Sequence, residues 1–160
     1  MKSLTASQLL NVWEQGHAAS IFQRSLMLLA AACSDLGKDD LFSMSIGKRD
    51  ASLLDLRDLI FGPTINCLEI CPGCGVPLEL SLRSSDLKTE CSDLPENPFS
   101  ILSGEYEINF RLPNSRDLLS ISACREVKEA KQMMLKCCIT GIRRNGEISR
   151  YDIQLPDDAM

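Results

Sequence analysis

The sequence has little histidine and lacks the common motifs of enzyme active sites. It contains a single histidine, His17, and neither a phosphate-binding glycine loop nor the strained turn that carries a catalytic serine. Any serine or cysteine nucleophile that needs an imidazole base would have to use His17. This histidine follows Gly16 at the end of an expected surface helix, where an interaction with the helix dipole is the ordinary explanation. We find no catalytic constellation and expect a protein that is not an enzyme and has no organic cofactor.

Long apolar runs and an excess of positive charge are also missing. The longest apolar run, residues 26–33, is far shorter than a membrane span, and residues 1–17 lack the unbroken apolar core of a signal peptide. The formal net charge is −5, whereas binding to a phosphate backbone comes largely from clustered Lys and Arg. We therefore expect a cytoplasmic protein that has neither a membrane nor a nucleic acid as its partner.

What is present predicts one domain. The 160 residues, 44% of them hydrophobic, are enough for one globular core and too few for two large ones. We expect a single domain over residues 1–160, with a helical part over 1–62 and a mixed part of antiparallel sheet and helix over 63–160.

Helix signals fill the first part of the chain. Two capping-box patterns start helices, Thr5 with Gln8 and Ser20 with Gln23. Residues 34–50 are rich in Gly, Ser and Asp, which is typical of a connection, and Asp50 is placed to cap a third helix.

After residue 63 the apolar residues recur at every second position, which is typical of strands. Residues 64–83 have the pattern of a half-buried hairpin, residues 84–104 that of a loop, and residues 105–113 that of a strand. Three further elements complete the prediction: a short helix capped by Asn114 or Ser115, a helix from Val127 to Cys137, and a closing hairpin turned at Asn145 and Gly146. The predicted class is α+β, with N-terminal helices, a central Cys-x-x-Cys hairpin, and an antiparallel sheet with two further helices.

Cys71 and Cys74 stand in the glycine-containing turn "CPGCG" of that hairpin. Such a turn lets backbone N–H groups point at two sulfurs that face one zinc ion. A closed zinc site needs two more ligands, and no second Cys-x-x-Cys occurs, so the remaining ligands stay open among the other cysteines: Cys67, Cys91, Cys137 and Cys138. A metal-free turn made rigid by Pro72 and the glycines is the alternative. A redox pair is less favoured, because that motif normally opens a helix.

Several blocks together resemble one protein family. The blocks "LLNVWEQG", "SIGKRDASLLDLRDLIFGP", "CPGCGVPLEL", "FRLPNSRDLLSI" and "LKCC" occur in this order from about Leu9 to about Pro156. The sequence resembles the baseplate hub assembly chaperones of T-even-type phages and related contractile injection systems. Longer members of that family carry a second knuckle similar to CPxCG near the C-terminus, which this sequence does not have.

The resemblance implies a chaperone that helps the baseplate hub assemble by protein–protein binding, in the cytoplasm of a bacterial host cell, with hub or other tail proteins as partners. Such a chaperone needs an exposed apolar patch or an unpaired strand edge. Candidate contact residues are Trp13 and Phe22 on the first two helices, and Arg111 and Arg116 around a proline turn, although core packing and loop geometry explain the same residues. Two other functions stay open: a permanent structural subunit of the baseplate, or a zinc-ribbon adaptor protein.

Overall fold

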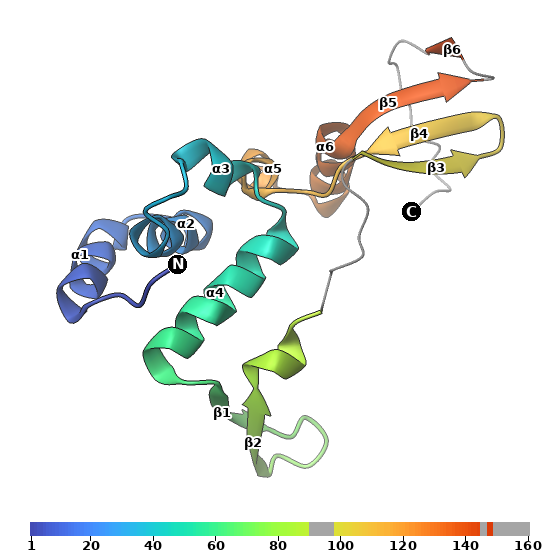
Figure 1. Cartoon of the computed structure of the whole chain (residues 1–160). Helices are drawn as coiled ribbons and strands as arrows, with labels where there is room; N and C mark the ends of the chain where they lie inside the picture. Colours follow the sequence, from blue (N-terminus) through green and yellow to red (C-terminus); the bar gives the residue numbers. More distant parts are fainter. Residues whose placement is uncertain (90–97, 145–146, 149–160) are drawn as a thin grey trace. The chain divides into compact units, whose positions relative to one another are not determined.

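The computed structural model describes residues 1–89, 98–144 and 147–148. The helices are α1 (Ala6–Gly16), α2 (Ile21–Ala32), α3 (Lys38–Ser43), α4 (Ile46–Phe61), the 3-10 helix η1 (Ser84–Leu87), α5 (Ser115–Ile121) and α6 (Val127–Cys138). The strands are β1 (Thr64–Ile70), β2 (Pro77–Arg83), β3 (Phe99–Ser103), β4 (Tyr106–Phe110), β5 (Ile139–Arg144) and β6 (Glu147–Ile148) (Figure 1). The α+β class predicted from the sequence is confirmed.

The contacts within the chain divide it into two compact units. Unit 1 consists of Met1–Ser92 and Asn114–Leu119, and unit 2 consists of Asp93–Pro113 and Ser120–Met160. Helices α1 to α4, the β1–β2 hairpin, η1 and most of α5 belong to unit 1, while α6 and the sheet of β3 to β6 belong to unit 2. The single domain expected from the sequence stays a prediction.

Both predicted capping boxes are confirmed. The backbone N–H of Gln8 donates to the Thr5 hydroxyl over 3.3 Å, and the backbone N–H of Thr5 donates to the Gln8 side chain over 2.9 Å. Ser20 and Gln23 repeat this exchange at the start of α2. Each box satisfies two N–H groups that a helix start would otherwise leave unpaired, which explains why both helices begin where the local sequence predicts.

The connection predicted over residues 34–50 is partly wrong. It contains the short helix α3, at whose start Asp40 accepts from the backbone N–H of Gly37 over 3.0 Å. Helix α4 starts at Ile46, where the Ser45 hydroxyl accepts from the N–H of Lys48 over 3.4 Å. Asp50 is therefore not the cap that we predicted. Its carboxylate pairs with the guanidinium of Arg49 instead, at 2.7 Å.

The core of unit 1 is made by the helices. One cluster of buried residues joins α2 and α3, and half-buried side chains from α3, from the residue that follows it and from α4 pack against it: Leu26, Leu29 and Leu41, with Phe42, Met44 and Leu53. A second cluster joins the N-terminal segment to α2 and α4: Leu4, Ala32, Cys33 and Leu56. Burial of these aliphatic side chains holds the helices together, at about 25 cal/mol for each Å² of apolar surface removed from water.

The start of α5 is fixed to the helices of unit 1 by buried polar groups. Asn114 pairs with Ser45 in a backbone bridge, and its side chain accepts from the N–H groups of Arg116 and Asp117. Asp117 accepts in return from the N–H of Asn114 over 2.8 Å. Of the two caps predicted for this helix, Asn114 and Ser115, the structure has Asn114.

Unit 2 is built on an antiparallel sheet in the order β3-β4-β5-β6. The strand predicted over residues 105–113 is confirmed as β4, but residues 99–103 form strand β3, where we expected a loop. Phe99 of β3 stacks on its partner Phe110 of β4 with ring centroids 5.6 Å apart. Such cross-strand contacts, more than the intrinsic preference of the segment, make it a strand. Strands β5 and β6 pair as a closing hairpin, and the predicted turn at Asn145 and Gly146 lies outside the described residues.

Candidate functional site

The β1–β2 hairpin of unit 1 extends beyond the helices instead of lying across them (Figure 1). Its register pairs Leu68 with Glu79, Cys67 with Leu80 and Ile70 with Pro77. Directly paired residues share a face of a sheet, so Leu68 and Ile70 lie on one face while Leu78, Leu80 and Leu82 lie on the other. The two strands therefore do not combine their leucines into a single apolar face.

The hairpin forms as predicted, but the prediction that one of its faces is buried is wrong. Leu68 is 70% exposed, Ile70 62% and Leu80 49%. The alternating pattern correctly indicated strands, but it could not show that the two apolar rows would point to opposite faces and that the helical core would leave both uncovered. A two-stranded hairpin with this much exposed aliphatic surface gains little stability by itself.

The base of the hairpin is held firmly to α4. The guanidinium of Arg57 donates to the carbonyl oxygens of Gly62 and Thr64 over 2.7 and 2.8 Å, and the N–H of Ser84 donates to that of Pro63 over 2.9 Å. The buried hydroxyl of Ser84 also donates to Asp58. These bonds join the entry to β1, the exit from β2 and α4, so the hairpin leaves unit 1 at a defined position.

Asp58 and Lys88 are the charged partners at this base. The pKa of the Asp58 carboxyl lies below its ordinary value, first because the Ser84 hydroxyl donates to it and then because Lys88 and Arg57 are near. The pKa of Lys88 is raised, chiefly by its hydrogen bond to Asp55. Both shifts favour the charged forms, which keeps the network ionised near neutral pH.

The Cys-x-x-Cys turn is at the tip of the hairpin. The N–H of Cys71 donates to the carbonyl of Val76 over 3.0 Å, and the N–H of Gly75 donates to the carbonyl of Cys71 over 2.9 Å. Gly75 has φ +73°, a conformation that side-chain-bearing residues rarely adopt. The turn therefore closes with its two cysteines at the surface, Cys74 exposed and Cys71 half-buried.

The sulfur of Cys71 also accepts hydrogen bonds in this turn. The backbone N–H of Gly73, then that of Cys74 and the Cys74 thiol, lower the pKa of the Cys71 thiol below its ordinary value. A cysteine binds a metal ion as the thiolate. Backbone N–H groups that stabilise the thiolate therefore favour metal binding. The pair can supply two zinc ligands.

The other candidate ligands lie in different places. Cys67 is half-buried on β1 of the same hairpin, whereas Cys137 and Cys138 belong to α6 of unit 2, and Cys91 lies outside the described residues. Within residues 1–89, 98–144 and 147–148, no three His, Cys, Asp or Glu side chains gather as a metal site.

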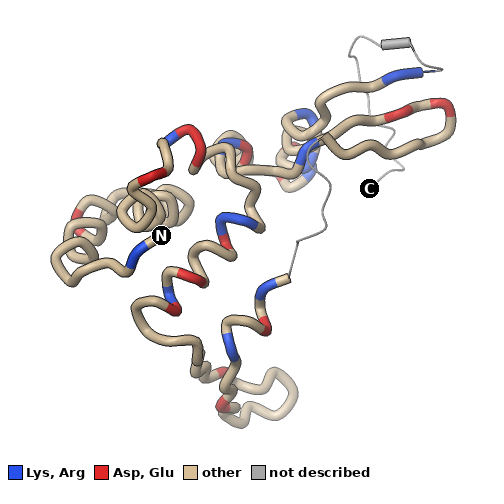
Figure 2. Tube along the Cα trace, viewed as in Figure 1, with Lys and Arg blue, Asp and Glu red and all other residues tan. Residues whose placement is uncertain are grey.

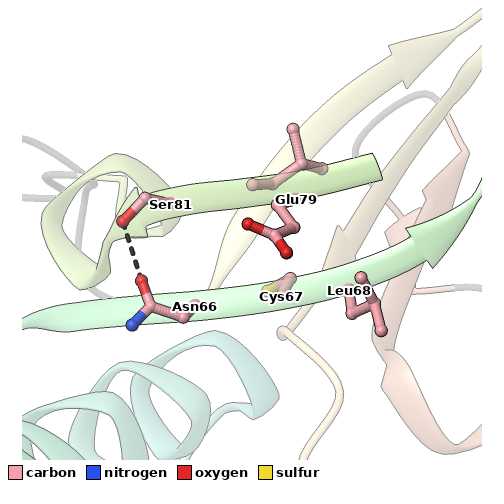
Figure 3. A pocket seen from close by; sticks show the side chains of 6 residues that line it. Asn66, Cys67, Leu68, Glu79 and Ser81 are labelled. Carbon is pink, nitrogen blue, oxygen red and sulfur yellow. Dashed lines mark hydrogen bonds between the residues drawn. The ribbon is translucent and has the colours of Figure 1, made fainter. Parts of the chain in front are cut away.

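An open hollow of about 500 Å³ lies on the hairpin, lined by Asn66, Cys67, Leu68, Glu79, Leu80 and Ser81. Figure 3 shows Asn66, Leu68 and Glu79 side by side across the two strands, with the Ser81 hydroxyl donating to the Asn66 side-chain oxygen over 2.9 Å. Of these residues, only Cys67 was a predicted site residue, as a possible zinc ligand. The absence of Lys and Arg between Arg57 and Arg83 could have indicated an acidic surface on the hairpin.

The first two predicted contact residues are on α1 and α2. Trp13 is 68% exposed, and its ring meets that of His17 edge to face at 6.4 Å. Exposed Leu10 lies one turn before Trp13 on the same side of α1. Phe22 is half-buried. Trp13 and Leu10 therefore form an exposed apolar surface on α1, whereas Phe22 on α2 is less exposed.

The two arginines belong to different units. Arg116 lies over the ring of Phe42, 5.5 Å from its centroid, and pairs with Asp39 within unit 1. Arg111 belongs to unit 2, where its N–H donates to the carbonyl of Cys138 over 2.9 Å and its side chain donates to that of Leu112 over 3.1 Å. Each arginine thus has contacts within its own unit.

Comparison with protein families matches residues 5–157 to the family described as T4 bacteriophage base plate protein. The chain belongs to this family. The match covers the α-helices, the hairpin and the sheet of this baseplate protein alike. Membership of the family implies interaction with other phage tail or baseplate proteins. Comparisons with curated proteins and with solved structures give no match. In the described part of the baseplate protein, no helix is long and apolar enough to cross a membrane.

Proposed function

We propose that this baseplate protein is a non-enzymatic assembly chaperone for the hub of a phage-like contractile tail or injection system. The observation that carries the proposal is the exposure of large apolar side chains on ordered elements of unit 1, namely Leu10 and Trp13 on α1 and Leu68 and Ile70 on β1. Exposed apolar surface on regular elements is typical of proteins that bind other proteins. We place this activity in the cytoplasm of the bacterial host cell, where tail parts are made.

Charge supports the choice of partner. The formal net charge of −5 disfavours nucleic acid, so we propose a protein partner, either the hub or another tail component. Association through apolar side chains on rigid elements needs no chemical step, and the chaperone would act by holding a docking surface of its partner until assembly.

A permanent structural subunit of the baseplate is the second candidate, because membership of a baseplate protein family is compatible with either role. Quantitative mass spectrometry of purified mature particles separates the two functions. A chaperone should be absent from particles, yet its deletion should stop hub assembly. Stoichiometric presence in every particle would make the chain a structural subunit and overturn the first proposal.

We also propose that Cys71 and Cys74 bind zinc. The donors to the Cys71 sulfur and the exposed position of Cys74 support this site. Four thiolates in a tetrahedral arrangement are the common structural zinc site, so two further ligands would have to join this pair.

A further inference from the structure

We propose that the face of the β1–β2 hairpin formed by Leu68, Ile70 and Glu79 holds the baseplate partner, and that it receives a protein segment in which aliphatic side chains adjoin a lysine or arginine. This inference rests on the proposed function, and it names the contact surface and the chemistry of the partner.

The apolar part of this surface is left open to solvent by the described residues of unit 1. Leu68 and Ile70 are the most exposed aliphatic side chains of the hairpin, although they belong to a strand that is fully paired with β2. They stand on the same face, two positions apart, so one partner segment could bury both. Removing such side chains from water is the main favourable contribution to protein association.

The charge of the hairpin determines what that segment must carry. Between Arg57 and Arg83 the sequence has acidic residues and no basic one, and Figure 2 shows red segments on the hairpin with no blue before the end of β2. Glu79 lies directly opposite Leu68 and takes part in none of the ion pairs of the described residues. A carboxylate beside aliphatic side chains favours a cation on the partner, because the attraction strengthens when water leaves the contact.

The surface also has a hollow that could receive a side chain of the partner protein. Leu68 and Glu79 both line the open hollow of about 500 Å³, beside the hydrogen bond from Ser81 to Asn66 (Figure 3). The bonds from Arg57 and Ser84 fix the base of the hairpin. A surface that is already ordered loses little conformational entropy when a partner binds, which favours affinity.

The test uses the full chain and the purified hub and tail proteins encoded beside it, with affinity measured by titration calorimetry. Leu68→Asn and Glu79→Lys should each weaken binding at least about tenfold, which corresponds to ~1.4 kcal/mol. The matched controls are Val127→Asn and Glu129→Lys on α6, where Val127 is 72% exposed and Glu129 is exposed as well. Both controls should bind like the unchanged chain, and circular dichroism should show that all four variants are folded.

The outcomes separate this inference from the proposed function. The hairpin surface would be overturned if both hairpin variants bound the baseplate protein as tightly as the unchanged chain, or if the α6 variants weakened binding equally. Either result would leave the chaperone proposal standing. Failure of the unchanged chain to bind any hub or tail protein would overturn both. Binding of the unchanged chain should also weaken with added salt, and the Glu79→Lys variant should lose much of that dependence.

Discussion

Arg49 and Ser115, 66 positions apart in the chain, meet in the interior of unit 1, where the guanidinium donates to the serine hydroxyl over 3.3 Å. Ser115 is fully buried and Arg49 is 6% exposed. Because Arg49 is on α4 and Ser115 begins α5, this bond joins the N-terminal helices to a segment that follows β4 in the sequence.

We predict that Ser115→Ala destabilises unit 1. It would remove an acceptor from a buried guanidinium, and a buried donor left without its partner costs about 1–3 kcal/mol. Urea unfolding followed by circular dichroism would measure the loss. Ser7→Ala on the exposed side of α1 is the control and should change stability little. Equal stability of both variants would show that the bond is not needed.

A second prediction concerns the turn at the hairpin tip. Gly75→Ala places a side chain at φ +73° and should destabilise the turn by roughly 1 kcal/mol. Gly73→Ala is the matched control, since its Cβ would lie 3.9 Å from the Cys71 sulfur, an ordinary contact. Hydrogen exchange at the amides of β1 and β2 should accelerate in the first variant more than in the second. The reverse order would contradict the role assigned to Gly75.

The zinc proposal predicts close to one equivalent of metal in the purified protein. Cys71→Ser and Cys74→Ser should each lose the zinc and lower the melting temperature, because metal binding adds to folding free energy. Inductively coupled plasma mass spectrometry measures the metal. Serine variants of the four other candidate cysteines, Cys67, Cys91, Cys137 and Cys138, would identify the remaining ligands. A metal-free preparation that melts just as cooperatively would refute the site.

Acid should loosen the base of the hairpin. The pKa of Asp58 is lower in the folded chain than its ordinary value of 3.8, so its ionised form contributes stability that is fully present above that value. This contribution is lost as the pH falls below 3.8 toward the lower folded value. NMR protection of the Ser84 amide, which donates to Pro63, should therefore decrease in this range. In Asp58→Asn, protection should be lower at neutral pH and should not show this decrease.

Local chemistry made several features predictable from the sequence. The capping boxes at Thr5 and Ser20 and the cap at Asn114 act over three residues or fewer, so the sequence alone shows them. The Cys-x-x-Cys turn was predictable in the same way, because its glycines and proline specify a tight turn whatever surrounds it.

Features that depend on distant partners were not predictable. Asp50 is of a residue type that often caps helices, but α4 starts earlier, at Ile46, where the Ser45 hydroxyl accepts from the N–H of Lys48. Strand β3 forms against β4, and its segment alone has the composition of a loop. Among the site residues, Trp13 could be placed on a helix, but its exposure and that of Leu68 could not be known before the core was assembled.

The amino-acid sequence by itself determined the α+β class, the helices and strands other than α3 and β3, the starts of three helices and the position of the cysteine turn, because short-range hydrogen bonding and the spacing of apolar residues decide these. Only the tertiary structure decided which apolar residues became core and which stayed at the surface. Leu29 and Leu68 have the same side chain, but the first is enclosed by helices and the second stands on a hairpin strand, 70% exposed. Burial depends on what packs against a residue, and that partner is supplied by the fold.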